Sequence, residues 1–228
     1  MINVLIACEE SQVEMMAFRS RGFNAYSCDI QKPKRGGDLR YQILGDVRPY
    51  LEGKATFRTM DGKLHRLSQW HLIIAHPPCT YLCRSSGVQM FRSGQLNLER
   101  YEKMKAARTF FMECYNANAP FVAVENPVPL RIAELPQSTC FVEPFWYGHP
   151  YSKKTVYWLR NLPPLMANAM CPAYREFVRC SRGKYRSRTF EGVAIAMADQ
   201  WGQYIKEQLP LINGTPRPST NPHHHPAP

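Results

Sequence analysis

Two segments of the chain place chemically capable side chains directly after short apolar runs. Cys79 follows residues 72–75 and two prolines, and Glu125 and Asn126 follow residues 121–124 and precede a third proline. Prolines cannot continue a sheet ladder, so each run predicts a buried strand with a stiff loop at its carboxyl end. Open α/β sheets bind ligands at that end of their strands. Cys79 and Glu125 are therefore a candidate nucleophile and acid.

Each of these elements also has a purely structural interpretation. A cysteine after two prolines is commonly a small buried hydrophobe, and a Glu-Asn pair before proline is commonly part of a turn. The two elements together, and in this order, match a known pattern.

Pro78-Cys79 resembles the catalytic Pro-Cys of DNA cytosine-C5 methyltransferases, and Glu125-Asn126 resembles their Glu-Asn-Val element. Residues 28–30 (Cys-Asp-Ile) and 45–47 (Gly-Asp-Val) look like the two acidic loops that hold the adenosyl part of S-adenosylmethionine in that family. Residues 147–157 are similar to its Tyr-Gly-Val-Pro-Gln-x-Arg-x-Arg strand. The resemblance runs from about residue 3 to about residue 202 and is greatest to the small members encoded by phages and prophages.

This resemblance implies methyl transfer from S-adenosylmethionine to cytosine C5 of DNA, which we expect to be double-stranded with the target base flipped out. Cys79 would attack C6, Glu125 would bind N3 and the exocyclic amine, Asn126 would orient the loop, and Lys153 would contact the base carbonyl or a phosphate. Asp29 would bind the ribose hydroxyls of the donor, and Asp46 would lie beside its adenine. The full set of expected donor-site residues is Ala7, Cys8, Glu9, Asp29, Ile30, Asp46, Val47 and Pro77.

The chain departs from the family pattern in three places. The family opens with Phe-x-Gly-x-Gly, whereas residues 7–11 read Ala-Cys-Glu-Glu-Ser. Tyr151, Lys153 and Thr155 stand where the family has Gln, Arg and Arg, and residues 190–194 replace its Gly-Asn-x-Val. These departures affect the expected donor site more than the cysteine chemistry.

The chain is basic, with a formal net charge of +11, and most of the excess lies in one segment. Residues 151–190 hold nine basic side chains and one acid, a local net charge of +8, with aromatic residues between them. Such a run is often plain solvated surface, but its concentration is also typical of a nucleic-acid contact. The side chains predicted to contact DNA are Arg84, Lys154, Arg182, Lys184 and Arg186.

Apolar runs alternate with helical patterns along the chain, which predicts an α/β fold with a doubly wound, mostly parallel sheet of the Rossmann-like kind. We expect strands near residues 2–7, 24–28, 71–75, 121–124 and 153–159, helices near 11–21 and 98–117, and loops at 32–44 and 80–97. The predicted organisation is a catalytic core at 1–159, a short basic recognition segment at 160–185, a C-terminal helix completing the core at 186–212, and a disordered tail at 213–228.

Composition limits the remaining possibilities. With 228 residues, 44% of them hydrophobic, the chain can build one substantial core. No apolar stretch is long enough to span a membrane, and no secretion signal precedes the eight cysteines, so we expect reduced thiols. No Cys-x-x-Cys pair occurs, and no metal site is predicted. We expect a monomer in the cytoplasm of the bacterial host of a phage or prophage.

Two other functional classes remain open at this point. Pro77-Pro78 also resembles the Asp-Pro-Pro-Tyr loop of amino-group (N4 or N6) methyltransferases, although His76 and Cys79 do not match its ends. Alternatively, the chain is a degenerate methyltransferase that binds nucleic acid without catalysis, because its glycine loop is lost.

Overall fold

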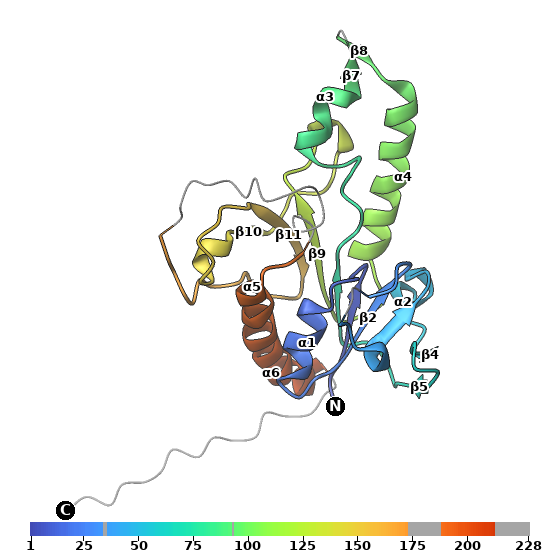
Figure 1. Ribbon diagram of the computed structural model, residues 1–228, viewed down its shortest axis with the longest axis vertical. Helices are drawn as coiled ribbons and strands as arrows, with labels where there is room; N and C mark the ends of the chain where they lie inside the picture. The colour runs from blue at the N-terminus through green and yellow to red at the C-terminus, as the bar shows by residue number, and fades with distance from the viewer. Residues whose placement is uncertain (34–35, 93, 173–187, 213–228) are drawn as a thin grey trace, which may run out of the picture.

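The computed structural model describes residues 1–33, 36–92, 94–172 and 188–212. A seven-stranded sheet lies at its centre (Figure 1). Its strands are β1 (Asn3–Ala7), β2 (Asn24–Asp29), β3 (Gln42–Leu44), β6 (Leu72–Ala75), β9 (Phe121–Pro127), β10 (Cys140–Val142) and β11 (Thr155–Arg160). They lie in the order β10-β11-β9-β6-β1-β2-β3.

The five strands from β3 to β9 are parallel, and β11 is antiparallel to both of its neighbours. Val4 of β1 pairs with Ala25 on one side and with Leu72 on the other. After β1, the chain adds β2 and β3 on one side of that strand and then crosses back to place β6 on its other side. The topological switch point therefore lies between β1 and β6. The predicted doubly wound, mostly parallel, Rossmann-like α/β class is confirmed.

Helices cover both faces of the sheet, which explains why its strands are continuous apolar runs rather than alternating ones. Val4 and Ile6 belong to the core on one face, and Leu5 and Ala7 belong to the core on the other. The first face is covered by α1 (Val13–Arg19), α5 (Glu191–Ala196) and α6 (Gly202–Ile212), and the second by α2 (Arg48–Leu51) and α4 (Leu98–Tyr115) (Figure 1).

The predicted C-terminal helix is present, although it begins at Glu191. A π-helical turn, η5 (Met197–Trp201), joins α5 to α6, and all three segments pack near α1. Trp201 is fully buried in this turn and its Nε1 donates to the carbonyl of Pro163 at 2.9 Å. The division into domains stays a prediction, since residues 173–187 and 213–228 lie outside the described part of the chain.

The prediction that residues 32–44 form a plain loop is wrong for the last part of that range, residues 39–44. A 3₁₀ turn, η1 (Leu39–Tyr41), leads into β3, which extends the sheet beside β2. β3 gave no apolar signal because Gln42 is its most buried residue. Gln42 is tolerated there because its Oε1 accepts hydrogen bonds from Ser27 at 2.7 Å and Gln12 at 3.1 Å.

The predicted loop at residues 80–97 also contains regular structure. It forms the 3₁₀ turn η2 (Arg84–Ser86), the short helix α3 (Gly87–Met90) and a hairpin of β7 (Phe91–Arg92) and β8 (Gln95–Leu96). These elements lie beside the first turns of α4 (Figure 1). Met90 is fully buried, so this segment is anchored and is not a plain surface loop.

Four smaller elements complete the described structure. Asp61-Gly62 forms the turn between β4 (Thr56–Arg58) and β5 (Leu64–Arg66), as its turn-type sequence predicts. Two 3₁₀ turns, η3 (Arg131–Ala133) and η4 (Pro144–Trp146), lie between β9 and β11. None of the helices in the described ranges is both long and apolar enough to cross a bilayer.

Close packing at the start of α5 gives a test of the fold. A Cβ on Gly192 would lie 2.0 Å from the carbonyl oxygen of Tyr147. We expect Gly192→Ala to lower the free energy of unfolding by roughly 1–3 kcal/mol in urea titrations, because this backbone clash outweighs the better helix propensity of alanine. Gln203→Ala, on the exposed side of α6, should change it by less than about 0.5 kcal/mol. Unchanged stability in Gly192→Ala would contradict this packing.

Candidate active site

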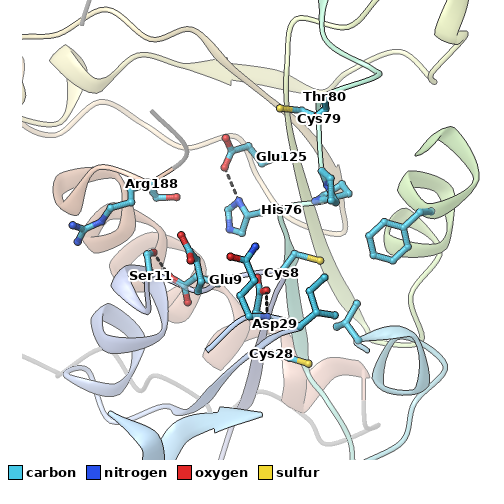
Figure 2. Close-up of a pocket in the computed structure, with 18 of the residues that line it drawn as sticks. Cys8, Glu9, Ser11, Cys28, Asp29, His76, Cys79, Thr80, Glu125 and Arg188 are labelled. Carbon is cyan, nitrogen blue, oxygen red and sulfur yellow. Dashed lines mark hydrogen bonds and ion pairs between the residues drawn. The ribbon is translucent and has the colours of Figure 1, made fainter. Parts of the chain in front are cut away.

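A pocket of about 740 Å³ lies at the carboxyl ends of the parallel strands (Figure 2). Its size falls within the roughly 300–1,000 Å³ typical of small-molecule sites. Among the predicted catalytic residues, Cys79, Glu125 and Lys153 line it and Asn126 does not. All of the predicted donor-site residues except Ala7 also line it.

Cys79 reaches the pocket from the segment that follows β6. The N–H of His76 still donates to the carbonyl of Ala7 at 3.0 Å, which ties the start of this segment to β1. The carbonyl of Cys79 accepts the N–H of Cys83 at 3.0 Å in a helical turn. Burial, the neighbouring Cys83 and the charge of Glu125 raise the pKa of the Cys79 thiol to about 11. At neutral pH the thiol is therefore protonated.

Glu125 lies within β9 and not on a loop after it. The strand continues to Pro127, and Glu125 pairs with Tyr157 of β11. The prediction that residues 121–124 form the whole strand was wrong, because the antiparallel partner β11 extends the ladder past the last apolar residue. A side chain held by a strand is positioned more rigidly than one on a loop.

The carboxylate of Glu125 is nearly buried, with 13% of its side chain exposed, and its Oε2 lies 2.6 Å from Nδ1 of His76 (Figure 2). Burial raises the pKa of Glu125. The charge of His76, the hydrogen bond from His76 and the charge of Lys153 together lower this pKa by more than burial raises it. The resulting pKa is below the ordinary value. Glu125 is therefore ionised at neutral pH in this structure.

His76 bridges Glu125 to a second carboxylate that the sequence analysis missed. Its Nε2 lies 2.8 Å from Oε2 of Glu14, whose side chain is fully buried in α1. The other oxygen of Glu14 accepts the hydroxyl of Thr189 at 2.6 Å. Burial lowers the pKa of His76, but the two carboxylates raise it well above its ordinary value by charge and hydrogen bonding. His76 is therefore a buried cation between two anions.

One ligand atom from each of Glu14, His76 and Glu125 lies within 4.8 Å of the others, a spacing that could suit a metal ion. Both ring nitrogens of His76 are, however, already in hydrogen bonds with the two carboxylates. The arrangement therefore fits a proton-sharing chain better than an open coordination site. The absence of a metal site stays a prediction.

The loop between β1 and α1 contains no glycine, although its backbone turns sharply. Cys8 and Gln12 both have φ of 60°, a left-handed conformation that glycine adopts more readily. The Glu9 carboxylate accepts the N–H groups of Glu14 at 2.8 Å and Met15 at 3.4 Å at the start of α1. The chain's own carboxylate thus occupies the N–H groups that could otherwise bind an anion.

Asp29 is the last residue of β2, and Asp46 lies two residues after the end of β3; both line the edge of the pocket. Asp29 accepts the N–H of Gln31 at 2.8 Å, and burial raises the pKa of its carboxyl group. Asp46 accepts the N–H of Arg48 at 3.0 Å, and this bond, together with the Arg48 side chain, lowers the pKa of Asp46. Asp29 is thus the aspartate whose proton is more easily retained.

Apolar surface lies between these aspartates and α4. Ile30 is 76% exposed beside Asp29, and Val47 and Phe110 line the same part of the pocket. The guanidinium of Arg48 lies 4.8 Å from the centre of the Phe110 ring. A carboxylate beside aromatic and aliphatic side chains suits a ligand with both hydroxyl groups and a flat ring. Phe110 had no sequence signal, because it lies in α4, far along the chain from the aspartates.

Two predicted site residues are buried away from the pocket. Ala7 is fully buried within β1, where only its backbone is near the loop. Asn126 is fully buried, and its Nδ2 donates to the carbonyl of Pro127 at 2.5 Å. This bond is consistent with holding the end of β9, and the roles of both residues stay predictions.

Of the predicted DNA contacts, only Arg84 and Lys154 belong to the described residues. Arg84 and Lys154 are exposed but do not line the pocket, and the Nζ of Lys154 lies 4.0 Å from the centre of the Phe141 ring. Arg182, Lys184 and Arg186 lie outside the described residues.

Lys153 and the segment before α5 close one side of the pocket. The Nζ of Lys153 donates to the carbonyl of Arg188 at 3.2 Å, and Arg188 and Thr189 both line the pocket. Arg188 was counted in the basic segment but not assigned to the site. Figure 2 shows its side chain on the same side of the site as Ser11 and Glu9.

Comparisons with known proteins give little further information. No protein-family model matches the chain, and no curated protein matches it. One similar solved structure is a crystal structure described provisionally as a DNA modification methyltransferase encoded within a prophage of E. coli. It is 13% identical, with a TM-score of 0.40 over 75% of this chain and 52% of that one, so the present chain spans about half of that protein's length. A likeness this weak does not bear on function.

Glu9 gives a pH-dependent test of the loop after β1. Burial and the neighbouring Glu14 raise its pKa to about 7, whereas an unfolded glutamate titrates near 4.3. Glu9 therefore keeps its proton to a higher pH in the folded state than in the unfolded state. As the pH rises through that interval, the contribution of Glu9 to the free energy of unfolding falls. We expect the free energy of unfolding of the wild type, relative to Glu9→Gln, to fall by roughly 1–3 kcal/mol between pH 4 and 8.

The matched control is Glu52→Gln at the exposed end of α2. Urea titrations at several pH values measure both differences. A difference between wild type and Glu9→Gln that stays constant with pH would show that Glu9 is not held in this buried, proton-retaining state.

Proposed function

We propose that this protein is an S-adenosylmethionine-dependent DNA cytosine-C5 methyltransferase. One observation carries the proposal: a single pocket at the switch point of the sheet unites Cys79, Glu125 and Lys153 with the acidic loops of Asp29 and Asp46. These residues lie up to 124 positions apart in the sequence. The family resemblance predicts each of them from the sequence alone, and their convergence in one pocket supports the assignment.

The residues of the pocket fit the adenosyl part of the donor. Asp29 can accept hydrogen bonds from ribose hydroxyls, and Ile30 and Phe110 offer apolar surface to adenine. The acidic side of the pocket, with Glu9 and Glu10, suits a positively charged sulfonium. When bound, the donor supplies an electrophilic methyl group.

The chemistry of cytosine assigns the role of Cys79. C5 is a weak nucleophile until a thiolate adds to C6 and makes the ring an enamine-like donor. As the Sγ–C6 bond forms, the thiol proton passes to solvent and the π electrons of the ring shift toward N3. The raised pKa of Cys79 means that this attack requires activation, because only a small fraction of the thiol is ionised at neutral pH.

Glu125 takes up a proton as the base binds and passes it to N3, where electron density accumulates, and it also hydrogen-bonds to the exocyclic amine. Lys153 orients the base carbonyl or an adjacent phosphate. After C5 is methylated, its proton passes to a base or water, the Sγ–C6 bond breaks, and N3 returns its proton. Within a duplex these contacts require the target base to be flipped into the pocket.

A specific observation favours one alternative. Glu9 occupies the first N–H groups of α1, and no glycine loop follows β1. A degenerate methyltransferase that binds nucleic acid without using a donor would have lost this loop. Amino-group methylation remains a further outcome of the test below.

The decisive experiment incubates the protein with methyl-labelled S-adenosylmethionine and separate samples of DNA, RNA and nucleotides, then digests them to nucleosides. We expect label in 5-methylcytosine from DNA. Label on N4 or N6 would establish the amino-group class. No transfer, together with no donor binding by calorimetry at millimolar concentration, would establish the degenerate class.

Donor binding tests the role of Asp29. We expect Asp29→Ala to raise the Kd of S-adenosylmethionine at least tenfold, which corresponds to about 1.4 kcal/mol, because two ribose hydroxyls lose their acceptor. Asp61→Ala, in the exposed β4–β5 turn, is the control and should leave the Kd unchanged. Calorimetry measures both. A Kd that Asp29→Ala leaves unaltered would move the donor site elsewhere.

Trapping tests the role of Cys79. DNA containing 5-fluorocytosine should form a stable covalent complex with the wild type, since fluorine cannot leave C5 as a proton does. We expect Cys79→Ser to form no complex and to lose turnover, with donor binding within about twofold of wild type. Cys140→Ser, in β10 away from the pocket, should still form the complex. Full turnover in Cys79→Ser would refute the assignment.

A further inference from the structure

The chain of Glu14, His76 and Glu125 joins three separate parts of the fold. Glu14 belongs to α1, His76 follows β6, and Glu125 belongs to β9. The two hydrogen bonds of the imidazole are 2.8 and 2.6 Å long, and 16% of the His76 side chain is exposed. The hydroxyl of Thr189 donates a hydrogen bond to the second carboxylate oxygen of Glu14. Every polar atom of the imidazole thus has a carboxylate partner.

We propose that His76 is a positioning residue that stores the proton which Glu125 delivers to N3 of the base, and that Glu14 is the fixed anion that keeps His76 charged. This inference rests on the proposed function and extends it. His76 does not contact the base and acts only through Glu125.

The charges around His76 favour its cationic form. Glu14 and Glu125 contact it directly, and Glu9 lies near enough for the charge of His76 to lower the pKa of that carboxyl group. The charge of Lys153 lowers the pKa of Glu125 and so helps to keep this partner of His76 ionised. Tyr157 of β11 also faces the cluster, and burial, Glu125 and Glu14 raise its pKa well above the ordinary value, so it is neutral.

The proton balance of the transfer is simple. When Sγ–C6 bond formation shifts electrons toward N3, the proton on Nδ1 of His76 moves to the ionised carboxylate of Glu125. Glu125 then passes this proton on to N3. His76 becomes neutral and Glu125 returns to its ionised form. When the Sγ–C6 bond breaks, the proton returns from N3 to His76 by the same route. No oxidant or further reactant is required.

A purely structural role for His76 is the competing explanation, since a cation between two carboxylates also ties α1, β6 and β9 together. The two explanations differ in their pH dependence. A structural bridge would lower activity by a similar factor at every pH. A proton store would move the pH at which activity is lost.

The first test uses the wild-type protein without substrate and does not depend on its activity. Ring ¹⁵N chemical shifts of labelled histidine report protonation, and the His76 signals are assigned by their absence in H76Q or by through-bond correlation to the backbone. We expect His76 to be an imidazolium at pH 7, because the two carboxylates raise its pKa well above the ordinary value. A neutral ring at pH 7 would overturn the inference whatever the reaction is.

The second test measures kcat/KM for methyl transfer against pH in variants. Glu14→Gln keeps the shape of the cluster and removes the fixed anion, so the alkaline loss of activity should move down by at least about one pH unit. Activity at pH 6, where His76 is still charged, should stay within about threefold of wild type.

His76→Gln should lose at least about tenfold at pH 8 and less at pH 6, where the buried Glu125 can carry its own proton. The control is His71→Gln at the amino end of β6, remote from the pocket, which should keep the wild-type profile. Uniform loss across pH in both cluster variants would overturn the inference in favour of the structural role. If no variant and no wild type transfers methyl groups, the proposed function fails, and the NMR result still decides the charge of His76.

Discussion

The site depends on a single topological constraint, the parallel alignment of β3, β2, β1, β6 and β9. Because these strands run in one direction, their carboxyl ends share an edge, and every residue that follows them is delivered there. The reversal between β1 and β6 separates the two sets of loops. Asp29 and Asp46 lie on one side, and Cys79 and Glu125 on the other. This strand order therefore brings the two aspartates and the Cys79–Glu125 pair to opposite sides of one pocket.

The site opposes folding through its electrostatics, because it buries three carboxylates. Glu14 is fully buried, and Glu9 and Glu125 are nearly so. Isolated carboxylates at such positions would take up protons or destabilise the fold. The chain compensates with His76 between two of them and with backbone N–H groups for Glu9. Removing one member leaves an unpaired buried charge, so the three side chains are compatible with the fold only as a set.

Sequence patterns predicted those elements that rest on continuous apolar runs. β1, β2, β6 and β9 were recognised in this way, and the candidate residues at their ends do share one pocket. β3 was missed because Gln42 is buried through hydrogen bonds and not through hydrophobicity. In α1, the apolar Met16 is 48% exposed, while the polar Glu14 is buried. Glu14 was missed because its partner His76 lies 62 residues away, and no local pattern reports such a pair.

The loop after β1 shows how the chain can depart from the glycine pattern and keep the backbone course that the site needs. Cys8 and Gln12 accept left-handed conformations, which cost roughly 1 kcal/mol each for residues other than glycine. Gln12 offsets its cost with hydrogen bonds to Ser27 and to the backbone of Asp38, which fasten α1 to the segment before β3. Side-chain hydrogen bonds thus impose the turn that glycine would permit. The same turn positions Glu14 against His76, so the altered loop and the buried charge chain form one structural unit.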